Sequence, residues 1–251
     1  MPKLLKHFIE PPRACVYLPE QTAQLENKVM LDVSPEQFGE MLLRGWRRFG
    51  PFYFRPSCKA CQACLSLRIP VDKFEPSATQ RRAWKRIEQL RIQIGPPQVT
   101  DERLALYHRW HRFREKLRGW PESKLEREEY QLEFAFPHPA AREITYHDDH
   151  APGGSRLIGV GLCDETPVGW SAIYFFYDPE YARWSPGVLN ILFQILQVRT
   201  RGLSHLYLGY WVEGCPSMRY KSTFRPYEIL QGRPEAYETP LWQPALGVTP
   251  P

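Results

Sequence analysis

Continuous apolar runs in the second half of the chain predict β-strands. Residues 157–163 and 168–177 are rich in β-branched and aromatic side chains, and Asp-Glu-Thr-Pro, a segment with turn chemistry, joins them. We therefore expect a pair of strands connected like a hairpin. Residues 205–210 and 226–230 predict two more strands.

Helical patterns alternate with these strands. Ser185-Pro186-Gly187 is typical of a capped helix start, and the apolar positions 189, 192, 193 and 196 that follow share one helical face. Cys215-Pro216 predicts a short helix that reaches about residue 223. The order strand, strand, helix, strand, helix, strand favours an α+β or α/β arrangement.

The first half contains fewer clear elements. Ser34-Pro35-Glu36-Gln37 is typical of a capped helix that ends near residue 45, and residues 65–71 alternate like a strand. Residues 80–90 are expected to be helical, and Thr100 is expected to cap a helix that reaches about residue 118. Gly-Pro-Pro at 95–97 is the best candidate for a domain boundary, and the Pro-rich segment 240–251 is expected to be irregular.

Composition narrows the class of protein. The chain has 251 residues, of which 43% are hydrophobic, enough to bury a core. No apolar run approaches the roughly 20 residues that a membrane-spanning helix needs, and the N-terminus lacks the pattern of a signal peptide. We expect a cytoplasmic protein without membrane contact. Its six cysteines are then metal ligands or reduced thiols rather than disulfides.

Three cysteines at two-residue spacing, Cys58, Cys61 and Cys64, are the sharpest chemical signal in the chain. Together with Cys15 they would complete a set of four thiolates and tie the N-terminal segment to a later loop. The spacing differs from that of paired zinc knuckles, and similar spacing occurs among iron–sulfur ligands. Zinc, an iron–sulfur cluster and metal-free thiols are the three alternatives.

Residues 44–86 form the most basic stretch, with 11 Lys or Arg against 2 Asp or Glu, although the whole chain carries a net charge of only +5. Aromatic residues are interleaved with these cations. Cations suit phosphates and aromatic faces suit unstacked bases, so the stretch predicts contact with nucleic acid, in particular with an RNA end. The alternative is a solvated basic surface whose aromatic residues lie in the core.

A second cluster, aromatic and largely uncharged, falls at the ends of the strands predicted in the second half. Such a cleft would suit an apolar aminoacyl group. Lys221, on the short predicted helix, could reach a carboxylate or a phosphate. The cluster consists of Tyr174, Tyr177, Asp178, Tyr207, Tyr210, Trp211 and Glu213.

Blocks in these segments resemble the bacterial branch of the aminoacyl-tRNA–protein transferases, a family of bacterial aspartate/glutamate leucyltransferases and eukaryotic arginyltransferases. The resemblance spans about residues 13–232 and keeps the order of the family's blocks. In the first half the blocks are Cys15-x-Tyr17-Leu18-Pro19, Gly45-Trp46-Arg47-Arg48-x-Gly50, Tyr53-x-Arg55-Pro56-x-Cys58-x-x-Cys61-x-x-Cys64 and Phe74-x-Pro76-Ser77-x-x-Gln80-Arg81-Arg82. In the second half they are Leu157-Ile-Gly-Val-Gly161, Ser171-Ala-Ile-Tyr174-Phe-Phe-Tyr177-Asp178-Pro179, Leu206-Tyr207-Leu-Gly209-Tyr210-Trp211 and Met218-x-Tyr220-Lys221.

The resemblance implies an α+β protein in two domains. A smaller, cysteine-bearing N-terminal α/β domain, residues 1–97, would precede a GNAT-like acyltransferase domain, residues 98–251. Acetyltransferases of that fold bind pyrophosphate with a glycine-rich turn at the start of the long helix. That turn is incomplete here, in Arg183-Trp-Ser185-Pro-Gly187-Val, which disfavours acetyl-CoA as the acyl donor.

The implied activity is the transfer of leucine from leucyl-tRNA to proteins whose N-terminal residue is Asp or Glu, which marks them for N-end-rule degradation. No cofactor is required for the transfer itself. Arginine is the alternative transferred group, because Asp178 and Glu213 could supply a carboxylate for it. A non-catalytic RNA-binding protein is the alternative from another functional class.

Each expected role has its candidate residues. Asp178, Tyr207 and Tyr210 are candidates for orienting the amine and relaying the proton, and Tyr174 belongs to the substrate cleft. The expected readers of the acceptor carboxylate are Arg47, Arg48 and Lys221; the expected contacts to the tRNA acceptor stem are Arg81, Arg82, Lys85 and Arg86; the expected ligands of zinc or an iron–sulfur cluster are Cys15, Cys58, Cys61 and Cys64.

Overall fold

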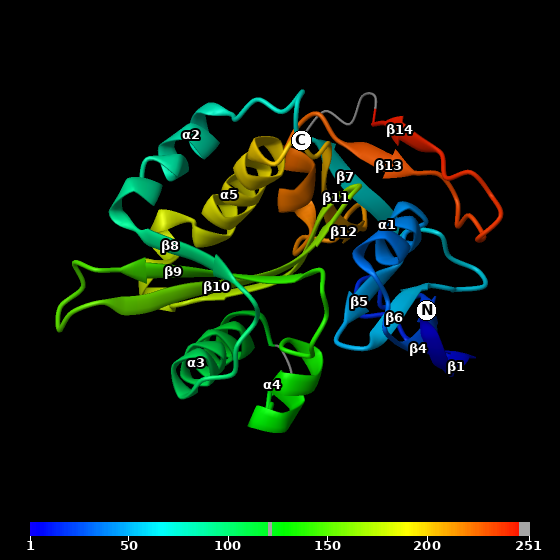
Figure 1. Cartoon of the computed structure of the whole chain (residues 1–251), viewed down its shortest axis with the longest axis horizontal. Coiled ribbons are helices and arrows are strands. Elements are labelled where there is room, and N and C mark those ends of the chain that lie inside the picture. The colour runs from blue at the N-terminus through cyan, green and yellow to red at the C-terminus, as the bar shows by residue number, and fades with distance from the viewer. Residues whose placement is uncertain (120–121, 246–251) are drawn as a thin grey trace.

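A large sheet and a small sheet lie side by side in the computed structural model, which describes residues 1–119 and 122–245 (Figure 1). The large sheet has eight strands in the order β14-β13-β7-β12-β11-β10-β9-β8. All neighbouring pairs are antiparallel except β11 and β12, which run parallel. The strands are β7 (Leu65–Pro70), β8 (Arg91–Gly95), β9 (Ala141–Asp148), β10 (Arg156–Thr166), β11 (Gly169–Tyr177), β12 (His205–Trp211), β13 (Glu228–Leu230) and β14 (Trp242–Pro244).

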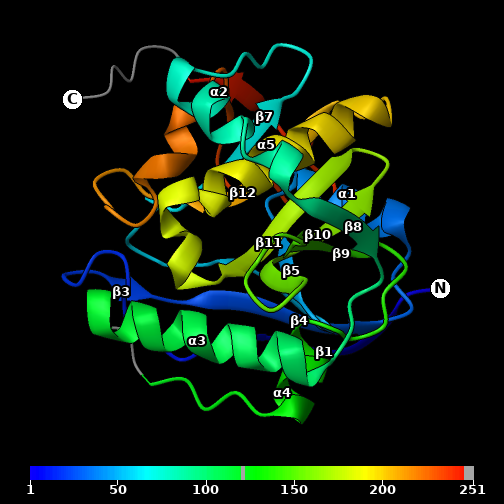
Figure 2. The same cartoon turned by 90° about the vertical axis from the view of Figure 1, so that its left-hand side faces the viewer.

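Helices cover both faces of the large sheet. Helix α5 packs on β11 and β12 with α2 against it, whereas α3 packs on β10 and β11 from the opposite face, where α4 also lies (Figures 1 and 2). Each face has its own apolar core. The helices are α2 (Ala78–Trp84), α3 (Asp101–Arg118), α4 (Arg127–Glu133) and α5 (Pro186–Thr200), with the 3₁₀ helices η1 (Ile87–Gln89), η2 (Pro179–Trp184) and η3 (Arg219–Thr223).

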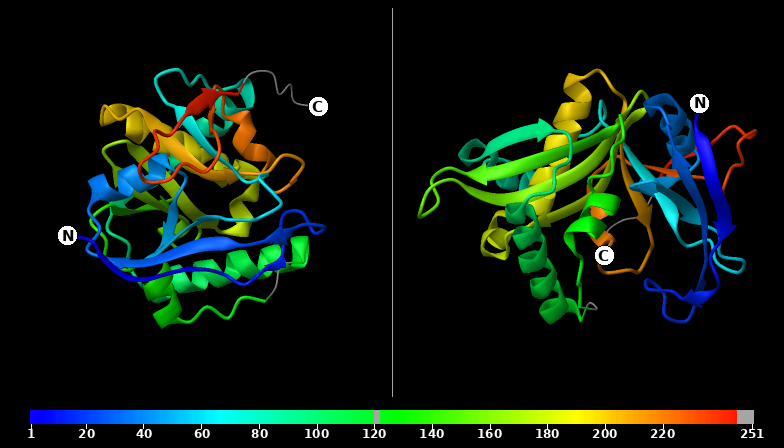
Figure 3. Two further views of the ribbon diagram at one scale, coloured as in Figure 1. Left: turned by 90° about the vertical axis from the view of Figure 1, so that its right-hand side faces the viewer. Right: turned by 60° about the horizontal axis from the view of Figure 1, so that its bottom comes forward.

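The small sheet is antiparallel, with four strands in the order β1-β4-β6-β5. Its strands are β1 (Lys3–Ile9), β4 (Leu25–Leu31), β5 (Arg47–Phe49) and β6 (Phe52–Pro56), helix α1 (Pro35–Leu43) connects β4 to β5, and β2 (Arg13–Ala14) pairs with β3 (Thr22–Ala23). Strand β1 lies at the end of the molecule opposite the β9–β10 hairpin (Figure 3). Among the described residues, no helix is long and apolar enough to span a membrane.

Local signals predicted several elements correctly. Ser34 and Gln37 form both bonds of a capping box at the start of α1, and Thr100 caps α3. The hairpin of β10 and β11 and strands β7, β12 and β13 are confirmed. Ser185 does precede α5, but its backbone is left-handed (φ 56°) and its side chain makes no cap bond.

The expected domain boundary after residue 97 does not separate the two sheets. Strands β7 and β8 precede it in the chain, yet both belong to the large sheet. Strand β7 lies between β12 and β13. The two halves of the chain are therefore interleaved in one sheet.

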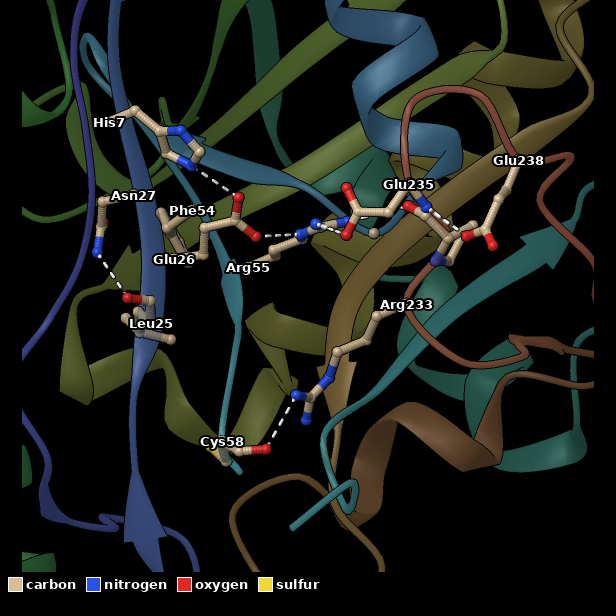
Figure 4. A network of polar contacts seen from close by, with 12 residues as sticks. His7, Leu25, Glu26, Asn27, Phe54, Arg55, Cys58, Arg233, Glu235 and Glu238 are labelled. Carbon is tan, nitrogen blue, oxygen red and sulfur yellow. Dashed lines mark hydrogen bonds and ion pairs between the residues drawn. The ribbon is translucent and has the colours of Figure 1, made fainter. Parts of the chain in front are cut away.

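Ion pairs also join the small sheet to the rest of the molecule. Arg55 of β6 donates to Glu26 of β4 at 2.6 Å and to Glu235, in the segment after β13, at 2.7 Å (Figure 4). Arg48 of β5 donates through Nε at 3.0 Å to Asp164 of β10, and both side chains are buried. Removing one partner of a fully buried pair such as Arg48–Asp164 costs about 3–5 kcal/mol, whereas the pair of Arg55 with the half-exposed Glu235 contributes less. The Arg48–Asp164 pair therefore does most to fix how the sheets meet.

Candidate functional site

A cavity of about 720 Å³ lies where β11 and β12 part. The two parallel strands pair only at Trp170↔Leu206 and Ser171↔Tyr207, near the start of each strand. Beyond these pairs, both strands contribute to the cavity wall, together with β5, η3 and the start of α5. The cavity thus lies between the two sheets, and its size is that of a small-molecule site.

Arg47 of β5 occupies the gap between the diverging strands. Its Nη2 donates to the backbone carbonyl of Ala172 on β11. On the other side it lies against Gly209 of β12, where an added Cβ would be 3.3 Å from the guanidinium carbon. Arg47 is only 8% exposed, and its Nη1 has no partner within the described residues. An unpaired buried donor is costly, so Nη1 is a ready partner for a ligand oxygen.

Every charged residue that lines the cavity is a cation. Within the described part of the chain these are Arg47, Arg48, Arg114 and Lys221, with no Asp or Glu beside them. Such a cavity attracts a carboxylate and repels a cationic side chain. The apolar part of the wall includes Phe49, Phe54, Ile173, Phe175, Val188, Ile191, Leu208 and Met218.

Lys221 of η3 reaches the cavity from beside β12. Its Nζ donates to the backbone carbonyl of Tyr210 at 2.5 Å. Burial, together with the nearby charge of Arg47, lowers the pKa of Lys221 to about 7. Lys221 is therefore mostly charged below neutral pH, about half charged near pH 7 and mostly neutral above it.

Tyr210 is the one member of the predicted catalytic set that lines the cavity. Its hydroxyl donates to the carbonyls of Gly45 at 2.9 Å and Phe54 at 3.1 Å. Burial raises the pKa of Tyr210 far above its usual range. The ring consequently forms a fixed part of the cavity wall, and its proton is already engaged by the scaffold.

The structure does not bring Tyr207 to the cavity. Tyr207 is 2% exposed and packs edge-on against Trp242 of β14. Its hydroxyl accepts a hydrogen bond from Arg68 of β7 at 3.3 Å. The side chain belongs to the packing between β12 and the strands beyond it.

Asp178 likewise lies outside the cavity lining. It caps η2 by accepting from the backbone N–H of Glu180, and it is 1% exposed. Arg156 approaches it at 2.6 Å and Arg109 at 3.3 Å, so its charge is neutralised within the scaffold. The predicted set of Asp178, Tyr207 and Tyr210 is thus not assembled in one place.

The other predicted substrate-binding residues differ in whether their polar atoms already have hydrogen-bond partners in the protein. The Nε of Arg48 is engaged by Asp164, and its Nη1 donates to the carbonyl of Gly50 at 2.9 Å, so Arg48 touches the cavity only as part of a buried pair. Tyr174 lines the cavity, and its hydroxyl bonds to Nε2 of His111 at 2.9 Å. Arg47 and Lys221 remain the cations with donor capacity directed at a ligand.

The predicted tRNA contacts lie on and just after α2, outside the cavity lining. Arg81, Arg82, Lys85 and Arg86 are exposed. The guanidinium of Arg86 lies 5.6 Å from the ring centroid of Trp184, at the end of η2. Contact between these cations and tRNA stays a prediction.

All four predicted cysteine ligands, Cys15, Cys58, Cys61 and Cys64, line one smaller cavity of about 100 Å³. Arg233 holds the cysteine loop by donating to the carbonyls of Cys58 at 3.1 Å and Cys61 at 2.7 Å, the first of which is drawn in Figure 4. Burial, with the other three thiols nearby, raises the pKa of Cys64 to about 11.

The chemistry of these donors suits zinc or an iron–sulfur cluster, since four thiols face one cavity and the buried Cys64 would need a cation beside it to ionise. In the structure, however, the four thiols are not positioned as ligands of one ion. Throughout residues 1–119 and 122–245, no three His, Cys, Asp or Glu side chains are placed to hold an ion. Metal binding stays a prediction.

Helix α3 supplies two cavity residues that were not predicted, Trp110 and Arg114. They are four residues apart and so share one face of the helix. The Arg114 guanidinium lies 5.2 Å from the Trp110 ring centroid, and Tyr177 of β11 packs on the same ring at 4.2 Å. The helical spacing of Trp and Arg was visible in the sequence, but nothing in it indicated that this helix borders the cavity.

Comparison with known proteins identifies the family. The model for the N terminus of arginine-tRNA-protein transferase matches residues 13–82, and the model for its C terminus matches residues 102–231. Together they cover most of the chain. This chain therefore belongs to the arginine-tRNA-protein transferase family.

Relatives at full length carry a more specific name, aspartate/glutamate leucyltransferase. The protein of that name from Helicobacter hepaticus is 35% identical over 95% of this chain and 98% of its own length. Those from Chromohalobacter salexigens (38% identical, 94% of each chain) and Halorhodospira halophila (37% identical, 87% of this chain, 91% of the relative) are similar. The solved structure of FemX superposes with a TM-score of 0.46 at 9% identity, covering 60% of this chain and 54% of FemX.

The contact between Gly209 and Arg47 predicts how a methyl group added at position 209 changes the stability of the protein. Gly209→Ala places a Cβ against the guanidinium at a backbone φ of +75°, so the free energy of unfolding should fall by about 2–3 kcal/mol. Gly232→Ala is the matched control, because Gly232 has a φ of +66° with nothing within 4 Å. It should lose only the backbone cost of about 1–2 kcal/mol. Urea unfolding measures the free energy of unfolding of both variants. Equal losses would show that Arg47 does not fill the gap between β11 and β12 beside Gly209.

Proposed function

We propose that this protein transfers leucine from leucyl-tRNA to the N-terminal Asp or Glu of acceptor proteins and so marks them for N-end-rule degradation. One observation carries the proposal: the cavity wall combines an apolar surface with cations and contains no carboxylate among the described residues. The names of the full-length relatives support the same reaction.

The wall favours leucine over arginine as the transferred residue. An arginyl side chain needs a buried carboxylate partner. Asp178, the first candidate for that partner, lies outside the lining and is paired with Arg156 and Arg109. Glu213, the second, is also outside the lining. A leucyl side chain needs only the apolar wall.

The cations favour an acidic acceptor residue. Nη1 of Arg47 is unpaired among the described residues, and Nζ of Lys221 faces the same cavity. Charge-assisted bonds from these two donors would hold the side-chain carboxylate of an N-terminal Asp or Glu. Arg48 supports this arrangement from behind through its pair with Asp164.

The reaction requires positioning more than acid–base chemistry. A free α-amine has a pKa of roughly 8, so a useful fraction is neutral near pH 7. Its nitrogen attacks the ester carbonyl carbon, the bond from that carbon to the ribose oxygen breaks, and a proton passes from the nitrogen to that oxygen. The enzyme holds the two reactants together. We assign this orienting role to Tyr210 and the cavity wall, with Asp178 and Tyr207 acting through the scaffold.

The acyl-transfer half is proposed to be GNAT-like, in keeping with its mixed sheet and with the parting of its one parallel pair of strands. Acetyl-CoA remains a poor donor candidate. The first residue of α5 is Pro186, which has no N–H to offer a phosphate, and Ser185 makes no cap bond. In this proposal the protein works in the cytoplasm, and the α2 cations contact the acceptor stem of the tRNA.

Transfer assays test the proposed function directly. Labelled leucine from leucyl-tRNA should appear on a peptide that begins with Asp, and arginine from arginyl-tRNA and acetyl from acetyl-CoA should not. A peptide that begins with Asn is the matched acceptor control, and its kcat/KM should be about 10–100-fold lower because the carboxylate is missing. Incorporation of acetyl alone, or equal rates on Asp and Asn peptides, would refute the assignment.

The shifted pKa of Lys221 predicts how acceptor binding depends on pH. The charged form binds the carboxylate, and this form is lost as pH rises through about 7. The KM for an Asp-initiated peptide should therefore rise about 3–10-fold from pH 6.5 to 8.5. In Lys221→Arg the charge persists, so this rise should vanish. Titration of the peptide amine affects both proteins alike, and the same rise in the arginine variant would exclude Lys221 as its cause.

We also propose that the four cysteines bind zinc or an iron–sulfur cluster. Protein purified without oxygen should contain one equivalent of zinc, or iron with sulfide and visible absorption. The double variant Cys58→Ser with Cys61→Ser should lose the metal, and Cys163→Ser, which alters a buried cysteine of β10, is the control that should retain it. Wild-type protein free of both metals would favour the metal-free alternative.

A further inference from the structure

Two basic helices offer a path for tRNA, and only one of them borders the cavity. Helix α3 contributes Trp110 and Arg114 to the wall, whereas α2 contributes no residue. The helices lie on opposite faces of the large sheet (Figures 1 and 2). The aminoacyl ester must reach the cavity, so the nucleotide that carries it must lie next to the cavity wall, part of which α3 forms.

The part of the cavity wall around α3, formed by Trp110, Arg114 and Tyr177, has the chemistry of a nucleotide site. Trp110 packs against Tyr177, with ring centroids 4.2 Å apart, and Arg114 lies over the Trp110 ring. Trp110 is only 7% exposed and serves as a support for these two side chains. Tyr177 and Arg114 are partly exposed; an aromatic side chain stacks on a base, and a neighbouring guanidinium suits a phosphate. The start of α5 also lines the cavity.

Further cations lie on the flank of α3 that faces away from this part of the wall. Arg109, Arg112 and Lys116 are spaced by three and four residues, which places them on one flank of the helix. Arg112 and Lys116 are exposed, and neither forms an ion pair within the described chain. Arg109 is partly exposed and shares Asp178 with Arg156. This flank carries free positive charge on the side of α3 that faces away from Trp110 and Arg114, outside the cavity lining.

We infer that the 3′ end of the donor tRNA reaches the cavity across α3, with Arg112 and Lys116 on backbone phosphates and the terminal adenosine at Tyr177 and Arg114. The inference rests on the proposed function, since it supplies the path for that reaction's donor. It separates the binding of the tRNA end, at α3, from that of the acceptor carboxylate, at Arg47 and Lys221.

The test is the double variant Arg112→Glu with Lys116→Glu. Both side chains are exposed, so thermal unfolding should match the wild type. Its Kd for leucine tRNA should rise at least about 10-fold near 0.1 M salt, and the slope of log K against log salt should fall by about 2, one for each lost phosphate contact. The KM for the acceptor peptide, at saturating leucyl-tRNA, should not change.

The matched control is Lys3→Glu with Lys6→Glu, which makes the same change in net charge at exposed positions of β1. It should leave the Kd for tRNA and its salt slope close to those of the wild type. A third variant, Arg81→Glu with Arg82→Glu on α2, shows how much the other helix contributes.

Two results would overturn the inference. One is an α3 variant whose Kd and salt slope match those of the β1 control, whatever the α2 variant does. The other is an α3 variant in which the acceptor KM rises as much as the Kd for tRNA, which would indicate general damage. Failure of the proposed function looks different, because the wild type would then not transfer leucine at all while the binding comparison could still be made.

Discussion

The guanidinium of Arg47 keeps β11 and β12 apart, and the cavity exists because of that separation. Parallel strands that begin to pair would otherwise continue to satisfy their backbone groups on each other. Arg47 instead bonds the Ala172 carbonyl and fills the space beside Gly209. A side chain from the small sheet thus shapes the site in the large one, and it keeps one donor for a ligand.

The next residue, Arg48, anchors β5, the strand that carries Arg47. Successive side chains on a strand point to opposite sides, so Arg47 enters the gap while Arg48 turns to Asp164 on β10. Outside the cavity lining, the carboxylates of Asp164 and Asp178 form ion pairs with Arg48 and Arg156. The carboxylates near the site are therefore neutralised, and the field inside it is set by cations.

Signals that span a few residues were readable from the sequence. The capping box at Ser34 and the apolar hairpin of β10 and β11 need only their own neighbours. Strands β1, β4 and β6 were missed because their polar and apolar residues alternate weakly and their partners are distant in the chain. The pairing of β7 with β12 joins residues on either side of the boundary expected after residue 97, which local composition cannot indicate.

The site was harder to predict for reasons of geometry. Tyr207 and Tyr210 are three apart on β12, a separation that alternation alone would send to opposite faces. A bulge between Tyr207 and Gly209 instead pairs them with Arg68 and Ser66, which are two apart on β7, so both tyrosines lie on one face of the sheet. The sequence did not indicate this bulge. Asp178 precedes Pro179, a pattern typical of a helix cap rather than of a catalytic acid. Which of the adjacent Arg47 and Arg48 faces a ligand depends on Asp164, more than a hundred residues away.

The insertion of β7 between β12 and β13 has a consequence for the integrity of the protein. A fragment beginning near residue 98 would lack an interior strand, and two open edges would meet where β7 had been. Neither half can then be inherited, exchanged or cleaved away as a self-sufficient unit. A protease cut between the halves would leave them associated, because β7 of the first half stays paired between β12 and β13 of the second.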